Sequence, residues 1–179
     1  RYIRMTLLEN ESASTNSPIV FVVDDDPAVC NSIERVLEPT DLKIECFQSA
    51  QSFLDRYDPN TPGCLILDLR MPGMGGLELQ EQLNRDAISL PIIFVTAFGE
   101  VTSAVQAMKS GAVDFFAKPF NAELLRSRVK DAVQRDADQR QHYSDWHAIE
   151  QRLLTLTPRE REVCDLITDG LTTKQIAAQ

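Results

Sequence analysis

The sequence predicts a five-stranded, doubly wound parallel α/β domain, followed by a long linker helix and the beginning of an all-α helix-turn-helix unit. Three observations predict this order. Short apolar runs alternate with helical periods between residues 18 and 118. Residues with a carboxylate, hydroxyl or ammonium group directly follow four of the five apolar runs. Between Pro119 and Pro158 the chain has neither glycine nor proline, which favours one long helix.

Four segments are expected. Residues 1–17 are polar and are expected to be disordered or to contain a tag remnant, with Met5 as a candidate native start. Residues 18–136 form the α/β domain, residues 137–155 the linker helix, and residues 156–179 an incomplete helix-turn-helix unit. The N-terminal segment lacks a signal-peptide pattern, and no apolar run approaches the ~20 residues that cross a bilayer.

The expected strands are short runs rich in β-branched and other apolar residues. Their continuous apolarity indicates a parallel sheet that is buried on both faces. These runs are residues 19–23, 42–47, 64–67, 92–95 and 113–117.

Helical periods lie between the strands. Apolar residues recur at helical spacing in residues 29–37 and again in residues 101–108. Asp26 is a good N-cap because Pro27 follows it at the first helical position. Gly111 is expected to end the later helix.

The charge and the cysteines limit the function classes. A net charge of -9 argues against a nonspecific polyanion binder, which would need clustered lysine and arginine. None of the four cysteines (Cys30, Cys46, Cys64 and Cys164) forms a CxxC pair, and three lie inside apolar stretches. We therefore expect buried, reduced thiols in a cytoplasmic protein rather than zinc ligands or disulfides.

The linker segment turns polar and charged after Gln134, and apolar spacing resumes at Trp146, Ile149, Leu153 and Leu154. A solvated helix is favoured over a dimerising stripe, because no sustained heptad is visible, but both stay open. After Leu156, the sequence Thr157-Pro158-Arg159-Glu160 is a capping box with proline at the first helical position. Gly170 is expected to end the helix that starts at Pro158, and residues 172–175 form a second capping box. Together they complete a helix-turn-helix pattern, and the sequence ends inside its second helix.

Ligands of an open α/β sheet bind beyond the carboxyl ends of its strands. The polar residues at those ends are Asp24, Asp25 and Asp26 after the first strand, Asp68 after the third, Thr96 after the fourth and Lys118 after the fifth. Carboxylates about 4 Å apart repel by roughly 4 kcal/mol near a protein surface. A hard cation such as Mg²⁺ offsets this repulsion. The capping role already accounts for Asp26, which makes it the weakest ligand candidate.

A carboxylate beside Mg²⁺ can attack an activated phosphoryl group and become an aspartyl phosphate. Asp68 is the candidate for this role, because an uncharged buried strand fixes its position. Lys118 can supply a charge and Thr96 a hydroxyl donor to the phosphoryl oxygens.

Four segments together resemble the signatures of CheY-like receiver domains, which have a flavodoxin-like fold. They are VVDDDP (residues 22–27), LILDLRMPGMGG (65–76), FVTA (94–97) and FFAKPF (115–120). The resemblance implies that Asp68 is phosphorylated, and that Asp25, Asp68 and the backbone carbonyl of Arg70 bind Mg²⁺, with Asp24 acting through water. It further implies that Thr96 and Lys118 sense the phosphoryl group, that Phe115 is a switch aromatic, and that Lys118–Pro119 is a cis peptide.

Residues 156–177 resemble the start of LuxR-type helix-turn-helix domains, and the two resemblances together indicate the NarL/FixJ class of response regulators. The helix that would enter the major groove is expected beyond Gln179. The DNA-binding residues are therefore unknown, with Lys174 as a candidate. The sequence departs from the family pattern at Phe98, two residues past Thr96, where polar residues are common. The resemblance implies that this position influences the rate of dephosphorylation.

We expect a two-component regulator of transcription in the cytoplasm. A sensor histidine kinase would phosphorylate it, the complete output domain would bind DNA, and a homodimer could form on phosphorylation; no membrane partner is expected. It would not be an enzyme, apart from slow self-dephosphorylation. One alternative is a receiver that acts through protein contacts without DNA. Another is an Mg²⁺-dependent phosphatase of the haloacid-dehalogenase type, which is disfavoured because its nucleophile would follow the first strand.

Overall fold

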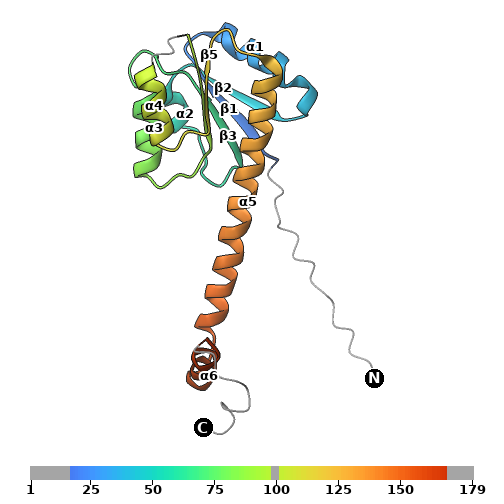
Figure 1. Cartoon of the computed structure of the whole chain (residues 1–179), viewed down its shortest axis with the longest axis vertical. Coiled ribbons are helices and arrows are strands. Elements are labelled where there is room, and N and C mark those ends of the chain that lie inside the picture. Colours follow the sequence, from blue (N-terminus) through green and yellow to red (C-terminus); the bar gives the residue numbers. More distant parts are fainter. Residues whose placement is uncertain (1–16, 98–100, 169–179) are drawn as a thin grey trace. The chain divides into compact units, whose positions relative to one another are not determined.

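The computed structural model describes residues 17–97 and 101–168 (Figure 1). The chain divides into two compact units, residues 1–137 and 138–179. None of the helices in the described residues combines the length and apolarity needed to span a bilayer.

The first unit is built on a five-stranded parallel sheet with the order β2-β1-β3-β4-β5. The strands are β1 (Ile19–Val23), β2 (Lys43–Phe47), β3 (Gly63–Leu67), β4 (Ile92–Thr96) and β5 (Asp114–Ala117). The predicted parallel α/β fold is confirmed, and the expected strand ends differ from the observed ones by at most one residue.

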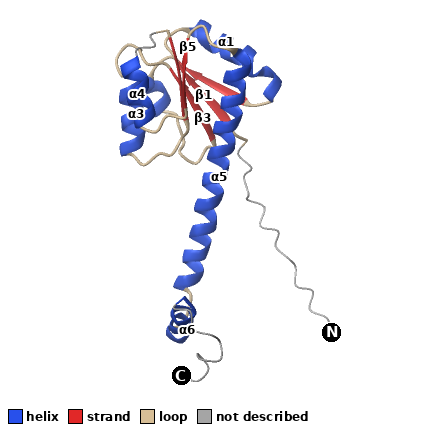
Figure 2. Ribbon diagram, viewed as in Figure 1, coloured by secondary structure: helices blue, strands red, loops and turns tan. Residues whose placement is uncertain are grey.

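Among the residues that the structure describes, five α-helices accompany the sheet, and helices cover both of its faces (Figure 2). They are α1 (Pro27–Leu37), α2 (Ala50–Leu54), α3 (Gly76–Arg85), α4 (Val101–Lys109) and α5 (Ala122–Leu154), with a short 3-10 helix η1 (Glu38–Thr40) after α1. Apolar residues of α2, α3 and α4 share one core cluster with alternate strand residues such as Phe21. The other cluster joins α1 and α5 to the intervening strand residues, such as Val22. This alternation explains why β1 and β3, which lie inside the sheet, carry no polar side chain.

The first half of α5 is tied to the sheet unit by polar contacts as well as by packing. The Arg126 Nε donates to the backbone oxygen of Val36 over 2.9 Å. At the other end, the buried carboxylate of Asp136 accepts a 2.8 Å hydrogen bond from the backbone N–H of Gly63. The helix continues without a break to Leu154 and so contains most of the segment expected as a linker helix. The proposed domain boundaries themselves stay predictions.

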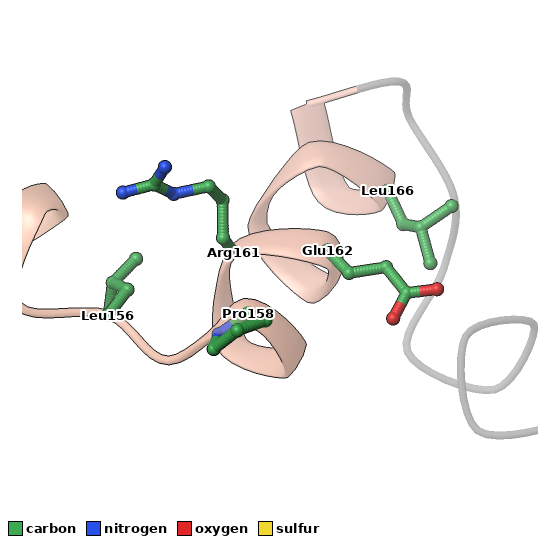
Figure 3. A pocket seen from close by; sticks show the side chains of 5 residues that line it. All are labelled: Leu156, Pro158, Arg161, Glu162 and Leu166. Atoms are coloured by element: carbon green, nitrogen blue, oxygen red, sulfur yellow. The ribbon is translucent and has the colours of Figure 1, made fainter.

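The second unit contains the rest of α5 and α6 (Pro158–Thr168). The predicted capping box is confirmed: the backbone N–H of Thr157 donates to Glu160 Oε2 over 2.8 Å, and the N–H of Glu160 donates to Thr157 Oγ1 over 3.3 Å. The side-chain and backbone hydrogen bonds from Thr157 hold the pKa of Glu160 below its usual value. Figure 3 shows the surface depression beside this cap, lined by Leu156, Pro158, Arg161, Glu162 and Leu166. Gly170 and the second capping box lie outside the described residues.

In this structure, the expectation that the four cysteines are reduced and buried is confirmed for Cys64 and is wrong for the other three. Cys30 and Cys46 are joined in a disulfide between α1 and β2. The physical reason is that β2 is an edge strand, so its apolar pattern did not mean full burial, and Cys46 is exposed. Cys64, on the central strand β3, is buried and free, and Cys164 is free and half-buried.

Candidate functional site

Backbone hydrogen bonds continue the sheet past the last residue of several strands and thereby fix the predicted site residues. The Asp24 N–H donates to Phe47 O over 3.1 Å, and the Asp68 N–H donates to Val23 O over 2.9 Å. The Lys118 N–H likewise donates to Thr96 O over 2.7 Å. The three side chains therefore start from one rigid edge of the sheet.

The side chains of Asp24, Asp68 and Lys118 meet at this edge. The Nζ of Lys118 lies 2.6 Å from Asp24 Oδ2 and 3.1 Å from Asp68 Oδ1. Both aspartates are 6% exposed, so most of their hydration has been removed. One ammonium group therefore serves two buried carboxylates, and these three side chains carry a net negative charge.

Burial and pairing act in opposite directions on the acid–base properties of this cluster. Burial raises the pKa of Asp24, and the hydrogen bonds and charge of Lys118 only partly offset it. Burial also lowers the pKa of Lys118, but the hydrogen bonds and charges of Asp24 and Asp68 together outweigh that effect and raise it. Lys118 is therefore positively charged at neutral pH.

The neighbouring loop residues complete the surroundings of the two carboxylates. The backbone N–H of Arg70 donates to Asp68 Oδ2 over 2.7 Å, and that of Asp26 donates to Asp24 Oδ1 over 3.0 Å. The Asp26 side chain accepts a 2.9 Å hydrogen bond from the N–H of Ala28, which confirms its predicted role as the α1 N-cap. Asp25 is exposed beside this cap.

Thr96 and Phe115 lie on the neighbouring strands. Thr96 is the last residue of β4 and is fully buried. Phe115 on β5 is half-buried, with its ring centroid 6.2 Å from that of Phe94. The Lys118–Pro119 peptide bond is cis. Phe98 and Lys174, which were also singled out, lie outside the described residues.

The donor set fits a hard divalent cation. Asp24, Asp25 and Asp68 supply carboxylate oxygens, and Arg70 supplies a backbone carbonyl in the adjoining loop. Carboxylate and carbonyl oxygens are the ligand types that Mg²⁺ accepts. Three carboxylates against the single ammonium of Lys118 also leave an excess negative charge that such a cation would offset.

Two supporting features of α3 were not predicted. A Cβ on Gly76, at the start of α3, would overlap the backbone oxygen of Asp68, so α3 begins in direct contact with Asp68. Further along, the amides of Gln80 and Asn84 each donate over 3.0 Å to backbone oxygens at the end of α4, those of Ala107 and Ser110. From the sequence alone, two amide side chains four residues apart would be assigned to a solvent-exposed helix face. Nothing in the sequence indicates that they contact the end of α4.

Comparison with known protein families gives two matches. Residues 20–130 match the response regulator receiver domain, and residues 154–179 match the bacterial regulatory proteins of the luxR family. Nodulation protein W of Bradyrhizobium diazoefficiens is 40% identical over 167 residues, which are 93% of this chain and 73% of that protein. The transcriptional regulatory protein FixJ of Azorhizobium caulinodans is 39% identical, over 88% of this chain and 75% of that protein.

Solved structures show the same similarity. The response regulator StyR superposes with a TM-score of 0.81 and 42% sequence identity, covering 90% of this chain and 82% of StyR. Full-length FixJ from B. japonicum superposes with a TM-score of 0.65 and 35% identity, covering 92% of this chain and 81% of that one.

Proposed function

Because this chain belongs to the response regulators that join a receiver domain to a LuxR-type DNA-binding segment, we propose that Asp68 is the residue through which phosphorylation controls its activity in transcription. The observation that carries this proposal is the position of Asp68 in the buried cluster. It follows β3, the middle strand of the sheet, is 6% exposed, and contacts Lys118 Nζ at 3.1 Å. The contacts with Lys118 Nζ and with the backbone N–H of Arg70 fix the orientation of the Asp68 carboxylate, which favours its attack on a phosphoryl donor brought to this edge.

The phosphoryl donor in this proposal is a phosphohistidine of a sensor kinase. An oxygen of the Asp68 carboxylate attacks phosphorus, the P–N bond breaks, and its electron pair stays on the imidazole nitrogen. Asp25, Asp68 and the carbonyl of Arg70 would hold Mg²⁺, with Asp24 acting through water. The cation, when bound, offsets the negative charge of the phosphoryl group.

Lys118 changes partner during this reaction. Before it, the ammonium group contacts Asp24 and Asp68. Phosphorylation converts the Asp68 carboxylate to an acyl phosphate and moves the negative charge onto the phosphoryl oxygens. Lys118 and the hydroxyl of Thr96 can then pair with those oxygens.

The α4–β5 face carries the signal in this proposal. Three α4 side chains on this face are well exposed, Val101 at 79%, Val105 at 47% and Met108 at 45%, and they line one depression together with Phe115. A shift of Thr96 toward the phosphoryl group would let Phe115 move and reshape this face. Apolar surface of this kind suits a second copy of the phosphorylated receiver domain.

The protein would act in the cytoplasm, where a kinase and DNA are both accessible, and would turn over only its own phosphoryl group. A receiver that acts without DNA is less well supported, because residues 154–179 match a DNA-binding family. A haloacid-dehalogenase-type phosphatase is also less well supported, since Asp68 follows β3 rather than the first strand.

The test is labelling by acetyl phosphate with Mg²⁺, followed by intact mass measurement. The wild type should gain one phosphoryl group and Asp68→Asn should gain none. Asp58→Asn is the matched control, since Asp58 is an exposed loop residue ten positions earlier, and it should be labelled normally. Labelling of Asp68→Asn at the wild-type rate would reject the assignment.

A further inference from the structure

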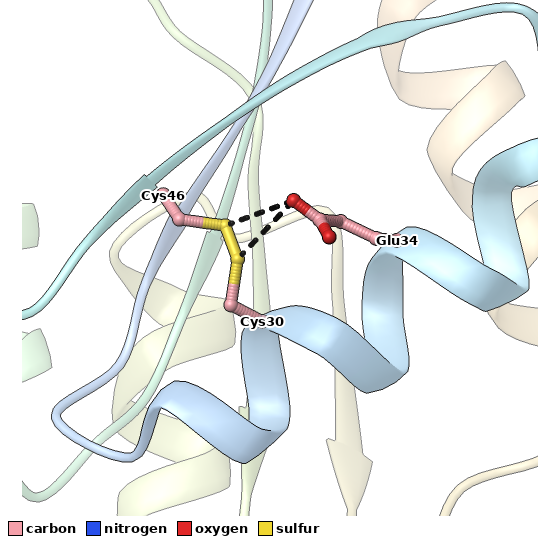
Figure 4. A group of neighbouring side chains, drawn as sticks. All are labelled: Cys30, Glu34 and Cys46. Carbon is pink, nitrogen blue, oxygen red and sulfur yellow. Dashed lines mark hydrogen bonds between the residues drawn. A yellow bond between two sulfur atoms is a disulfide. The ribbon is translucent and has the colours of Figure 1, made fainter.

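Two cysteines and a glutamate lie together on the surface of the receiver domain (Figure 4). Cys30 comes from the beginning of α1, Cys46 from the end of β2, and Glu34 from the next turn of α1. The two Sγ atoms are bonded, and the Cα atoms lie 6.2 Å apart. This separation is within the range of about 4.4–6.8 Å that disulfides span without backbone movement.

The fold holds both cysteines in place independently of the bond. Cys46 pairs with Val22 in the parallel register of β1 and β2. Cys30 follows one turn after the Asp26 cap that starts α1. Two thiols held in this way react with each other as an intramolecular pair, which favours closure of the ring once one of them has been activated.

Solvent can reach this pair. Cys46 is exposed and Cys30 is half-buried, whereas Cys64 is completely buried. Small thiols and disulfides in solution can therefore reach the Cys30–Cys46 bond, and accessibility is a condition for a labile or regulatory disulfide.

The surroundings accommodate the reduced state as well. Glu34 Oε1 lies 3.9 Å from each Sγ atom. A thiol can donate its S–H to this carboxylate, while the disulfide has no hydrogen to donate. The reduced pair thus keeps a polar partner, and neither redox state leaves a buried donor without one.

We propose that Cys30 and Cys46 form a reversible redox site that exchanges with low-molecular-weight disulfides of the glutathione type. One cysteine thiolate attacks oxidised glutathione, giving a mixed disulfide and releasing one glutathione thiolate. The second cysteine attacks the protein sulfur of that mixed disulfide and releases the second glutathione. The protein loses two protons and two electrons, and one oxidised glutathione becomes two reduced molecules. In a reducing compartment the dithiol is the resting form, and the disulfide forms under oxidising conditions.

The experiment uses the full chain equilibrated at a series of reduced-to-oxidised glutathione ratios. Each sample is quenched with acid, and its free thiols are counted by alkylation under denaturing conditions and mass spectrometry. Of the four cysteines, the oxidised protein should expose two as thiols, and excess reduced glutathione should restore all four. A tryptic digest of the oxidised form should contain residues 5–35 linked to residues 44–56.

Serine variants separate this pair from the other cysteines. Cys30→Ser and Cys46→Ser should each lose the linked peptide and retain glutathione on the remaining cysteine. Cys164→Ser is the matched control and should keep the linked peptide.

Three results would overturn the proposal. The first is a cross-link that runs through Cys164 or between chains. The second is a Cys30–Cys46 bond that excess reduced glutathione fails to open. The third is stoichiometric Zn²⁺ binding that blocks oxidation of the reduced protein, because the three ligand atoms lie within 4.8 Å of one another and would then be a metal site.

Discussion

Substitution of Gly76 by alanine tests whether the start of α3 holds Asp68, the proposed phosphoryl acceptor, in place. The added Cβ would overlap the backbone oxygen of Asp68 and would lie 3.0 Å from Phe94 Cε1. The clash is with backbone on one side and with a fully buried ring on the other, so neither neighbour can simply swing away. Asp68 or the start of α3 must move.

The magnitude follows from two opposing effects. Overpacking of a filled interior costs about 1–3 kcal/mol. Replacing glycine by alanine inside a helix increases the free energy of unfolding by up to about 1 kcal/mol. The gain is smaller here because Gly76 is the first residue of α3. We expect a net loss of about 1–2 kcal/mol in the free energy of unfolding. If Asp68 is the nucleophile, its displacement should slow phosphorylation much more, by about tenfold to a hundredfold.

The assay combines urea denaturation, followed by far-ultraviolet circular dichroism, with the rate of labelling by acetyl phosphate. Gly111→Ala is the matched control: a left-handed φ of 95° makes alanine unfavourable there, but an added Cβ meets nothing within 4 Å. That variant should lose a similar stability of about 1–2 kcal/mol and keep the wild-type labelling rate. If Gly76→Ala were labelled at the wild-type rate, the contact between α3 and Asp68 would not position the acceptor.

Three further predictions concern the α1 cap and the cysteines. Asp26→Ala should lower the free energy of unfolding, measured by urea denaturation, by about 1 kcal/mol because the α1 cap is lost. Asp25→Ala should instead chiefly weaken Mg²⁺ binding, measured by fluorescence or calorimetric titration. Equal losses of Mg²⁺ affinity in the two variants would refute this division of roles. Cys64 should resist alkylation in the folded protein at pH 8, because burial first and the charge of Asp136 second raise its pKa to about 12; rapid native-state labelling at Cys64 would contradict its burial. Closing the Cys30–Cys46 bond, which spans 16 positions, should stabilise the fold by about 3 kcal/mol by restricting the unfolded chain, and equal melting temperatures with and without reductant would contradict this.

Much of the fold and the centre of the site could be predicted, because both follow from short-range patterns. Buried parallel strands must be apolar, so the strands were predictable to within a residue. The carboxyl ends of parallel strands meet at one edge, so the approach of Asp24 and Asp68 to Lys118 followed once the strands were assigned.

The features that escaped prediction depend on which surfaces meet in three dimensions. Helix α2 has only five residues, too few to display a helical period. The contact of Gly76 with Asp68 depends on the angle at which α3 starts. The proximity of Cys30 to Cys46 depends on β2 being the edge strand next to α1, and the apolar pattern around Cys46 gave no information on that position.

The most direct test of the account is to locate the phosphoryl group itself. Borohydride converts an aspartyl phosphate to homoserine, which marks the phosphorylated residue permanently. After labelling with acetyl phosphate and Mg²⁺, the tryptic peptide of residues 57–70 contains both Asp58 and Asp68, so its fragment masses compare the two within one molecule. If Asp68 is the acceptor, homoserine should appear at position 68 and aspartate should remain at position 58. Homoserine at Asp58 or at Asp24, with Asp68 intact, would contradict this assignment.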